Sequence, residues 1–129
     1  MKTILVLEDD PSNMFAFTAL LWSTGYYVLE AATGKEAIDA GNSRRNVDLL
    51  VADVEVPELS GTAVALQLSK SHGAMSVLFV SGTPMDAWSS NDLDNFRQLP
   101  HDRVDFIEKP FWPMAFLDRI GGLLAHTKC

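Results

Sequence analysis

Short apolar runs alternate with amphipathic or polar segments along the chain. Five of these runs are four to six residues long and rich in branched apolar residues, which is typical of buried strands; they cover residues 3–7, 26–31, 48–52, 76–80 and 104–107. Helical patterns follow them, at residues 11–24, 33–38, 62–71, 85–99 and 114–126. Strict alternation of strand and helix predicts a doubly wound α/β fold, with right-handed crossovers and helices on both faces of a parallel sheet.

Capping residues support several of these helix boundaries. Asp10 followed by Pro11 is typical of a helix start, with Asp as the N-cap and Pro at the first helical position. Gly25 stands where a glycine commonly ends a helix, and Thr33 is placed to cap the second helix. The fourth helix is the least regular, because the polar residues 89–92 interrupt its apolar pattern.

Acidic, hydroxyl and amino side chains come shortly after four of the five predicted strands. Ligands of open α/β sheets bind beyond the carboxyl ends of the strands, so we expect these side chains to meet at one edge. They are Glu8, Asp9 and Asp10 after the first strand, Asp53 after the third, Ser81 after the fourth and Lys109 after the fifth. Taken alone, the three acids of the first strand would equally fit a helix N-terminus, where the helix dipole favours negative charge.

This combination of side chains has a specific chemistry. Carboxylates that converge without partners repel one another and are driven toward protonation. A divalent cation relieves that repulsion, and Mg²⁺ prefers a few carboxylates while keeping several waters. A hydroxyl and an ammonium group suit the oxygens of a phosphoryl group, and an aspartate can act as the nucleophile that forms an aspartyl phosphate. The residues therefore predict a phosphoryl site that uses Mg²⁺.

Four sequence motifs at these strand ends resemble a known family. LVLEDD, VADVEVPELSG, LFVSG and FIEKPF are similar, in order and position, to the motifs of receiver domains of two-component response regulators, the CheY-like family. Each motif alone is common, but the four together at successive strand ends are specific. The resemblance covers residues 1–129 as one receiver domain. It implies a flavodoxin-like sheet of five parallel strands in the order 2-1-3-4-5, with five helices.

The resemblance also implies which residues hold the phosphoryl group and the metal. Asp53 would be the phosphoacceptor and, with Asp9, a direct Mg²⁺ ligand. Glu8 would reach the metal through water, and the backbone carbonyl of Glu55 would be a further ligand. Lys109 would pair with a phosphoryl oxygen.

Other positions correspond to the family's switch. Ser81 would hydrogen-bond the phosphoryl group and draw its loop inward, and Phe106 occupies the aromatic switch position. Pro110 would follow a cis peptide bond.

Three features depart from the usual pattern. Phe106 has no hydroxyl with which to bond as a tyrosine would, and Glu55 places an acid where the family varies widely. The stretch from Ser81 to Lys109 is also a few residues longer than usual, mostly between Ser89 and Arg103.

Composition narrows the setting of such a domain. The chain has 129 residues and 14.2 kDa, enough for one domain with its own core. Its net charge of −7 argues against nonspecific binding to nucleic acid or to an anionic membrane, and no apolar run is long enough to cross one. The only cysteine is Cys129, which favours a reducing compartment. We therefore expect a cytoplasmic location.

The function that this resemblance implies is a phosphorylatable signalling switch. It would take a phosphoryl group from a histidine kinase or a histidine phosphotransfer protein and signal to a downstream protein by a change of surface. It would not be an enzyme beyond promoting its own phosphorylation and dephosphorylation. One alternative is a pseudo-receiver that binds partners without phosphate. Another is a dehalogenase-type phosphohydrolase, which requires D-x-D after the first strand, whereas this chain has E-D-D.

The first predicted helix carries aromatic residues beyond its core-facing stripe. Helical spacing places Ala16, Phe17, Leu20 and Leu21 on one apolar stripe that we expect to face the sheet. Phe15 and Trp22 lie seven residues apart on the other side, flanked by Met14 and Thr18. They could anchor the phosphodonor or a homodimer, or they could pack under a neighbouring loop. Trp112, by contrast, is expected to pack in the core beside the last helix.

Overall fold

A parallel five-stranded sheet forms the centre of the structure, a computed structural model that describes residues 1–44 and 46–126. Its strands are β1 (Thr3–Leu7), β2 (Tyr27–Ala31), β3 (Leu49–Asp53), β4 (Ser76–Ser81) and β5 (Val104–Glu108). They lie in the order β2-β1-β3-β4-β5, and every neighbouring pair is parallel. The predicted order is therefore confirmed, and each strand begins and ends within one residue of its predicted bounds.

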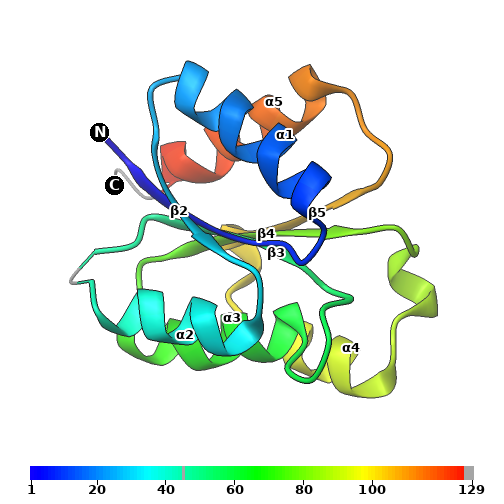
Figure 1. Ribbon diagram of the computed structural model, residues 1–129. Helices are drawn as coiled ribbons and strands as arrows, with labels where there is room; N and C mark the ends of the chain where they lie inside the picture. The colour runs from blue at the N-terminus through cyan, green and yellow to red at the C-terminus, as the bar shows by residue number, and fades with distance from the viewer. Residues whose placement is uncertain (45, 127–129) are drawn as a thin grey trace.

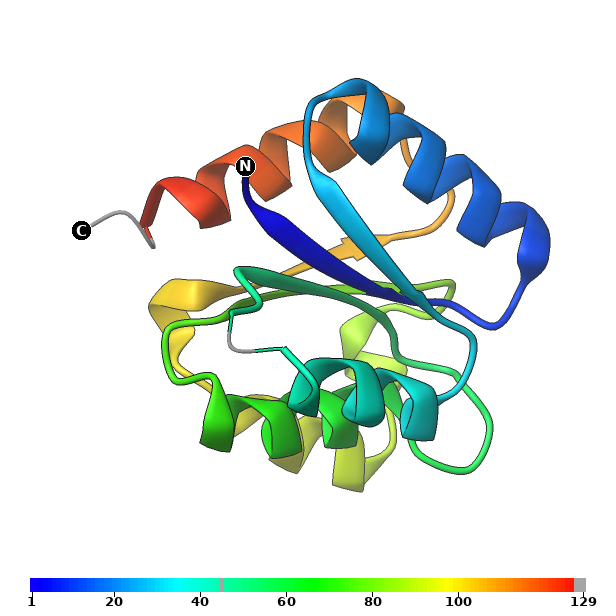
Figure 2. The ribbon, with the colours of Figure 1, turned by 60° about the vertical axis from the view of Figure 1, so that its left-hand side comes forward.

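Helices cover both faces of this sheet (Figure 1). One face carries α1 (Pro11–Ser23) and α5 (Pro113–His126), and the other carries α2 (Gly34–Asn42), α3 (Gly61–Ser71) and α4 (Ser90–Arg97). The view turned by 60° shows the same two layers (Figure 2). The five α-helices of the described residues confirm the predicted doubly wound fold.

The fourth helix is shorter than its predicted range of residues 85–99. A separate 3₁₀ turn covers Met85–Ala87, and α4 begins only after it. Ser89 accounts for the break, because its side chain accepts a hydrogen bond of 3.1 Å from the backbone N–H of Asp92 and so caps a new helix. The buried Trp88 lies between the two segments.

Two apolar layers hold the helices on the sheet. Successive strand residues point to opposite faces, so the strands contribute to both layers. Leu68 and Phe79 lie in the layer under α2, α3 and α4. Phe17 and Phe116 lie in the layer under α1 and α5, where their rings stack with centroids 5.3 Å apart. Because β1, β3 and β4 are buried along their whole length, the residues at their ends are held firmly at the sheet edge.

The sheet-facing side of α1 differs from the predicted stripe. Ala16 is exposed, so the prediction that it faces the sheet is wrong, whereas Leu20 is partly buried and packs against the apolar layer under α1 and α5, as predicted. Thr18 is buried instead, because its hydroxyl donates to the carbonyl of Met14 at 2.9 Å and needs no water. The buried residues of α1 are Met14, Phe17, Thr18 and Leu21.

Three aromatic side chains are exposed on this half of the molecule. Phe15 is 75% exposed and Trp22 is 50% exposed, as predicted, although the residues expected to flank them are buried. The ring of Trp22 packs edge-on against Tyr27 at a centroid distance of 5.8 Å, which supports the packing alternative for this residue. Trp112 is 81% exposed, so the prediction that it packs in the core is wrong.

Two further predictions concern membrane spanning and the single cysteine. Within the described residues, every helix is too short or too polar to cross a membrane. The single cysteine, Cys129, lies outside the described residues.

Candidate functional site

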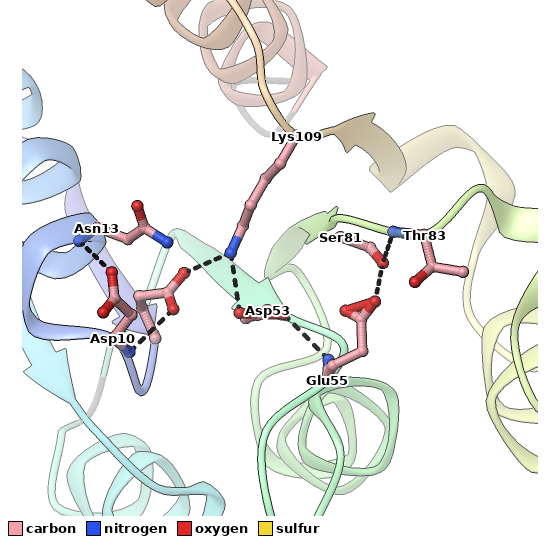
Figure 3. Close-up of polar contacts among 8 residues, drawn as sticks. Asp10, Asn13, Asp53, Glu55, Ser81, Thr83 and Lys109 are labelled. Carbon is pink, nitrogen blue, oxygen red and sulfur yellow. Dashed lines mark hydrogen bonds and ion pairs between the residues drawn. The ribbon is translucent and has the colours of Figure 1, made fainter.

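The carboxyl ends of four strands bring the predicted site residues to one edge of the sheet (Figure 3). Asp53 ends β3 and Ser81 ends β4. Glu8 directly follows β1, and Lys109 directly follows β5. Gly61 is required beside them, because a Cβ there would collide with the carbonyl oxygen of Asp53. Glycine thus lets α3 begin tightly against the end of β3.

Lys109 is the cation at the centre of this edge. Its ammonium group donates to Asp53 Oδ2 at 3.0 Å and to Glu8 Oε1 at 3.1 Å (Figure 3). Its backbone N–H donates to the carbonyl of Ser81 at 2.7 Å, which fixes the start of the loop after β5. One lysine thereby bridges two buried carboxylates from different strands.

Charge is crowded around this lysine. Glu8 is only 1% exposed, and burial raises the pKa of its carboxyl to about 7, with the negative charge of Asp53 adding to the rise. Hydrogen bonds from the Asp10 backbone and from Lys109 oppose that rise only in part. For Lys109, burial alone would lower the pKa, but the hydrogen bonds and charges of Asp53 and Glu8 outweigh burial and raise it. The site therefore has more negative charge than its one cation neutralises.

Three carboxylates of this edge fit a divalent cation. Glu8, Asp9 and Asp53 each offer an oxygen, and these oxygens lie within 4.8 Å of one another. Hard oxygen ligands of this kind suit Mg²⁺, and the crowded charge around Glu8 is what a cation would relieve. Asp10 has a different role, because its side chain caps α1 by accepting from the backbone N–H of Asn13 at 3.0 Å.

The hydroxyl of Ser81 lies in a second group of contacts (Figure 3). It donates to Glu55 Oε1 at 2.5 Å and accepts a hydrogen bond of 3.0 Å from the backbone N–H of Thr83. The backbone N–H of Glu55 donates in turn to Asp53 Oδ1 at 3.0 Å. The structure thus brings Glu55 to the site through its side chain, a contact that the sequence motifs did not predict.

Sheet register explains why Glu55 reaches Ser81. Asp53 of β3 lies opposite Val80 of β4, so the residue after Val80 is next to the loop that follows Asp53. An acid two residues past the end of β3, beside a serine at the end of β4, was a signal that could have predicted this pair.

Trp88 is a second contact that the sequence did not predict. Its indole N–H donates to the carbonyl of Thr83 at 3.1 Å, and its ring packs edge-on against Phe106 with centroids 5.2 Å apart. Phe106 therefore has an aromatic neighbour that is hydrogen-bonded to the loop after Ser81.

The predicted cis bond before Pro110 is confirmed.

The fold and the site together define a doubly wound α/β protein with an acidic pocket, bridged by a lysine, at the carboxyl edge of its sheet. The response regulator receiver domain family matches residues 4–121. The chain belongs to this family, which confirms the resemblance drawn from the sequence. Domains of this family are signalling switches that bind Mg²⁺ in the acidic pocket and interact with histidine kinases and downstream targets.

Known relatives include both free-standing regulators and parts of larger proteins. The polar-differentiation response regulator DivK of Brucella anthropi is 35% identical over 126 residues, which cover 98% of this chain and 98% of DivK. The sensor kinase CckA of Brucella abortus is 36% identical over 111 residues, or 84% of this chain but only 11% of the kinase. The chain spans 50% of the Bacillus subtilis regulator PhoP, to which it is 28% identical.

Solved structures agree on the fold. A CheY-like receiver domain protein from Methanospirillum hungatei matches with a TM-score of 0.87 at 24% identity, covering 99% of this chain and 97% of that one. At this identity the likeness supports the fold alone.

Proposed function

We propose that this chain is a switch that accepts a phosphoryl group from a phosphohistidine donor onto Asp53, acting as one receiver unit in the cytoplasm. The observation that carries the proposal is the position of Asp53. Its side chain is buried at the end of β3, held at Oδ2 by the ammonium of Lys109 and at Oδ1 by the backbone N–H of Glu55. These contacts orient both oxygens of the carboxyl, as a nucleophile at this position requires.

In the proposed reaction a carboxylate oxygen of Asp53 attacks the phosphorus of the donor. The bond between phosphorus and the histidine nitrogen breaks, and its electron pair stays with the imidazole. Lys109 then pairs with a phosphoryl oxygen, since its ammonium already lies 3.0 Å from Asp53. Mg²⁺, held by Glu8, Asp9, Asp53 and the carbonyl of Glu55, would supply positive charge against the phosphoryl oxygens.

The same groups would promote the loss of the phosphoryl group to water, so the chain acts on itself and turns over no separate substrate. The pseudo-receiver alternative lacks support, because Asp53, Lys109 and the acids around them are all present and in contact. The dehalogenase-type alternative lacks support because the chain has E-D-D after β1 and belongs to the receiver family.

Mass spectrometry with a small-molecule donor tests this proposal. Incubation with acetyl phosphate and Mg²⁺ should add the mass of one phosphoryl group, and Asp53→Ala should abolish the gain. Absence of any gain in the wild-type chain would favour a phosphate-independent binding module. A gain that persists in Asp53→Ala would place the acceptor elsewhere.

A groove beside Lys109 is the surface that we propose for the phosphodonor. A cavity of about 360 Å³ lies between α1 and the loop after β5, and its lining runs from Ala16 and Phe17 to Lys109 and Phe111. The groove ends at the lysine that touches Asp53, so a donor helix lying there would bring its phosphohistidine to the acceptor. On α1, Phe15 and Trp22 lie on the opposite flank from the residues that line the groove, and they remain the second candidate face, for the donor or for a homodimer.

Donor comparison distinguishes the two faces. Ala16→Arg blocks the groove without removing core packing, because Ala16 is exposed. Transfer from a phosphorylated histidine phosphotransfer protein should slow at least about tenfold, while the rate with acetyl phosphate stays unchanged. Ala19→Arg is the matched control, since Ala19 is exposed on the same helix and does not line the groove. A selective loss in Phe15→Ala with Trp22→Ala instead would assign the donor to the other face.

A further inference from the structure

The hydroxyl of Ser81 already has a partner in the resting structure. Ser81 is fully buried, and its hydroxyl hydrogen is donated to Glu55 Oε1 at 2.5 Å. Its oxygen accepts from the backbone N–H of Thr83 at 3.0 Å. A serine hydroxyl has one hydrogen to donate. Any other acceptor, including a phosphoryl oxygen on Asp53, must therefore compete with the carboxylate of Glu55.

The position of Glu55 makes this competition direct (Figure 3). Its backbone N–H is bonded to Asp53 Oδ1, and its side chain extends across to the end of β4. Glu55 thus contacts both the proposed acceptor and the hydroxyl that the phosphoryl group would recruit. A phosphoryl group carries roughly two negative charges and replaces the single charge of the Asp53 carboxylate. Those charges would repel the carboxylate of Glu55 from the same side of the site.

Contacts beyond Ser81 give the competition a structural consequence. The segment after β4 is tied at two points: the Thr83 N–H is bonded to Ser81, and the Thr83 carbonyl is bonded to the indole of Trp88. Trp88 packs edge-on against Phe96 of α4 and Phe106 of β5. A change of partner at the Ser81 hydroxyl would therefore alter the contacts of the segment after β4, which is connected through Trp88 to α4 and β5.

We propose that Glu55 is a positioning residue that holds the Ser81 hydroxyl in the resting state and must release it before Ser81 can bind the phosphoryl group. This inference rests on the proposed function, because it assigns to Glu55 the control of that same site. Glu55 favours the resting state by keeping the hydroxyl occupied. Trp88, through Thr83, reports whether the hydroxyl has been released.

Beryllofluoride with Mg²⁺, a stable analogue of the phosphoryl group, tests the proposal through a double-mutant cycle. The resonance of 5-fluorotryptophan at Trp88 gives the readout, assigned with Trp88→Phe. A hydrogen bond to a charged group corresponds to about tenfold in affinity. When Ser81 is present, Glu55→Ala frees the hydroxyl and also removes charge repulsion, so it should lower the half-saturating beryllofluoride concentration by about tenfold or more. In the Ser81→Ala background, Glu55→Ala should lower the half-saturating concentration by about threefold or less, because only charge repulsion is then removed.

A matched control and a resting-state measurement sharpen the test. Glu58→Ala removes an exposed charge from the same loop and should change the half-saturating concentration by less than about twofold. Without beryllofluoride, Glu55→Ala and Ser81→Ala should each shift the Trp88 resonance, and the double variant should shift it no further. Equal factors in both Ser81 backgrounds would overturn the proposal. If the wild-type chain shows no response to beryllofluoride and Mg²⁺, the proposed function falls as well; if it responds but the factors are equal, only this inference falls.

Discussion

The site consists of two groups of residues that are held in different ways. The lysine group, Glu8, Asp53 and Lys109, is joined by ion pairs between two buried carboxylates and one partly buried ammonium group. The serine group, Glu55, Ser81 and Thr83, is joined by a hydroxyl that donates once and accepts once. Lys109 stays beside Asp53 whether or not Asp53 carries a phosphoryl group, whereas the single hydrogen of the Ser81 hydroxyl must leave one acceptor before it can reach another. The comparison indicates that the lysine group receives the charge and the serine group responds to it.

The largest expected effect concerns Glu8 in protein free of divalent cations. Its pKa is about 7 in the folded chain against 4.5 for an ordinary carboxyl, so the folded state keeps a proton that the unfolded state has lost. Stability from this group is therefore complete below pH 4.5 and is lost as the pH rises through about 7. The free energy of unfolding should fall by up to about 3 kcal/mol across this window. Urea unfolding at each pH measures it, and Glu8→Gln should remove this part of the pH dependence. Parallel profiles for the two proteins would contradict the electrostatic description of the lysine group.

Removal of the lysine should have the next largest effect. Lys109→Ala leaves two buried carboxylates without their cation and should lower the free energy of unfolding by about 2 kcal/mol, because protonation of Glu8 offsets part of the cost. Lys35→Ala is the matched control, since its pair with Asp39 is largely exposed and should contribute no more than about 0.5 kcal/mol. Both values come from urea unfolding at neutral pH. Equal losses in the two variants would mean that the ion pairs of Lys109 stabilise the fold no more than an exposed ion pair does.

The serine group should show a smaller effect. Trp88→Phe keeps an aromatic ring against Phe106 but removes the hydrogen bond to the carbonyl of Thr83, which should cost about 1 kcal/mol. Trp112→Phe changes an exposed ring and should stay within about 0.5 kcal/mol of the wild type. A loss in Trp88→Phe as large as that in Lys109→Ala would remove the contrast between the two groups.

The sequence predicts the lysine group better than it predicts the serine group. The strands, their order and the meeting of Asp53 with Lys109 could be predicted, because they depend on apolar runs and on which residues follow the strand ends. The pairing of Glu55 with Ser81 depends instead on how far one side chain reaches across neighbouring strands. Residue types near the strand ends place an acid and a serine side by side, but they do not show that the Glu55 side chain turns toward Ser81.

Trp88 and α1 show the same limit of pattern reasoning. Trp88 lies in a region that reads as one long helix, and only the cap at Ser89 divides that helix and leaves Trp88 between the two segments. On α1, the predicted stripe was wrong at Ala16, which is small enough to be left exposed, and it missed Thr18, whose hydroxyl bonds to its own helix backbone and can be buried. A pattern based on hydrophobicity alone misses a polar side chain that can be buried because it hydrogen-bonds to the backbone of its own helix.

The most direct test is a crystal structure with Mg²⁺ and beryllofluoride bound at Asp53. We expect Lys109 to stay beside Asp53, while the Ser81 oxygen leaves Glu55 Oε1, 2.5 Å away in the resting state, and approaches a fluorine to within about 3.2 Å. A structure in which the ligand occupies Asp53 and Ser81 still donates to Glu55 would contradict the division of the site into a group that receives charge and a group that responds.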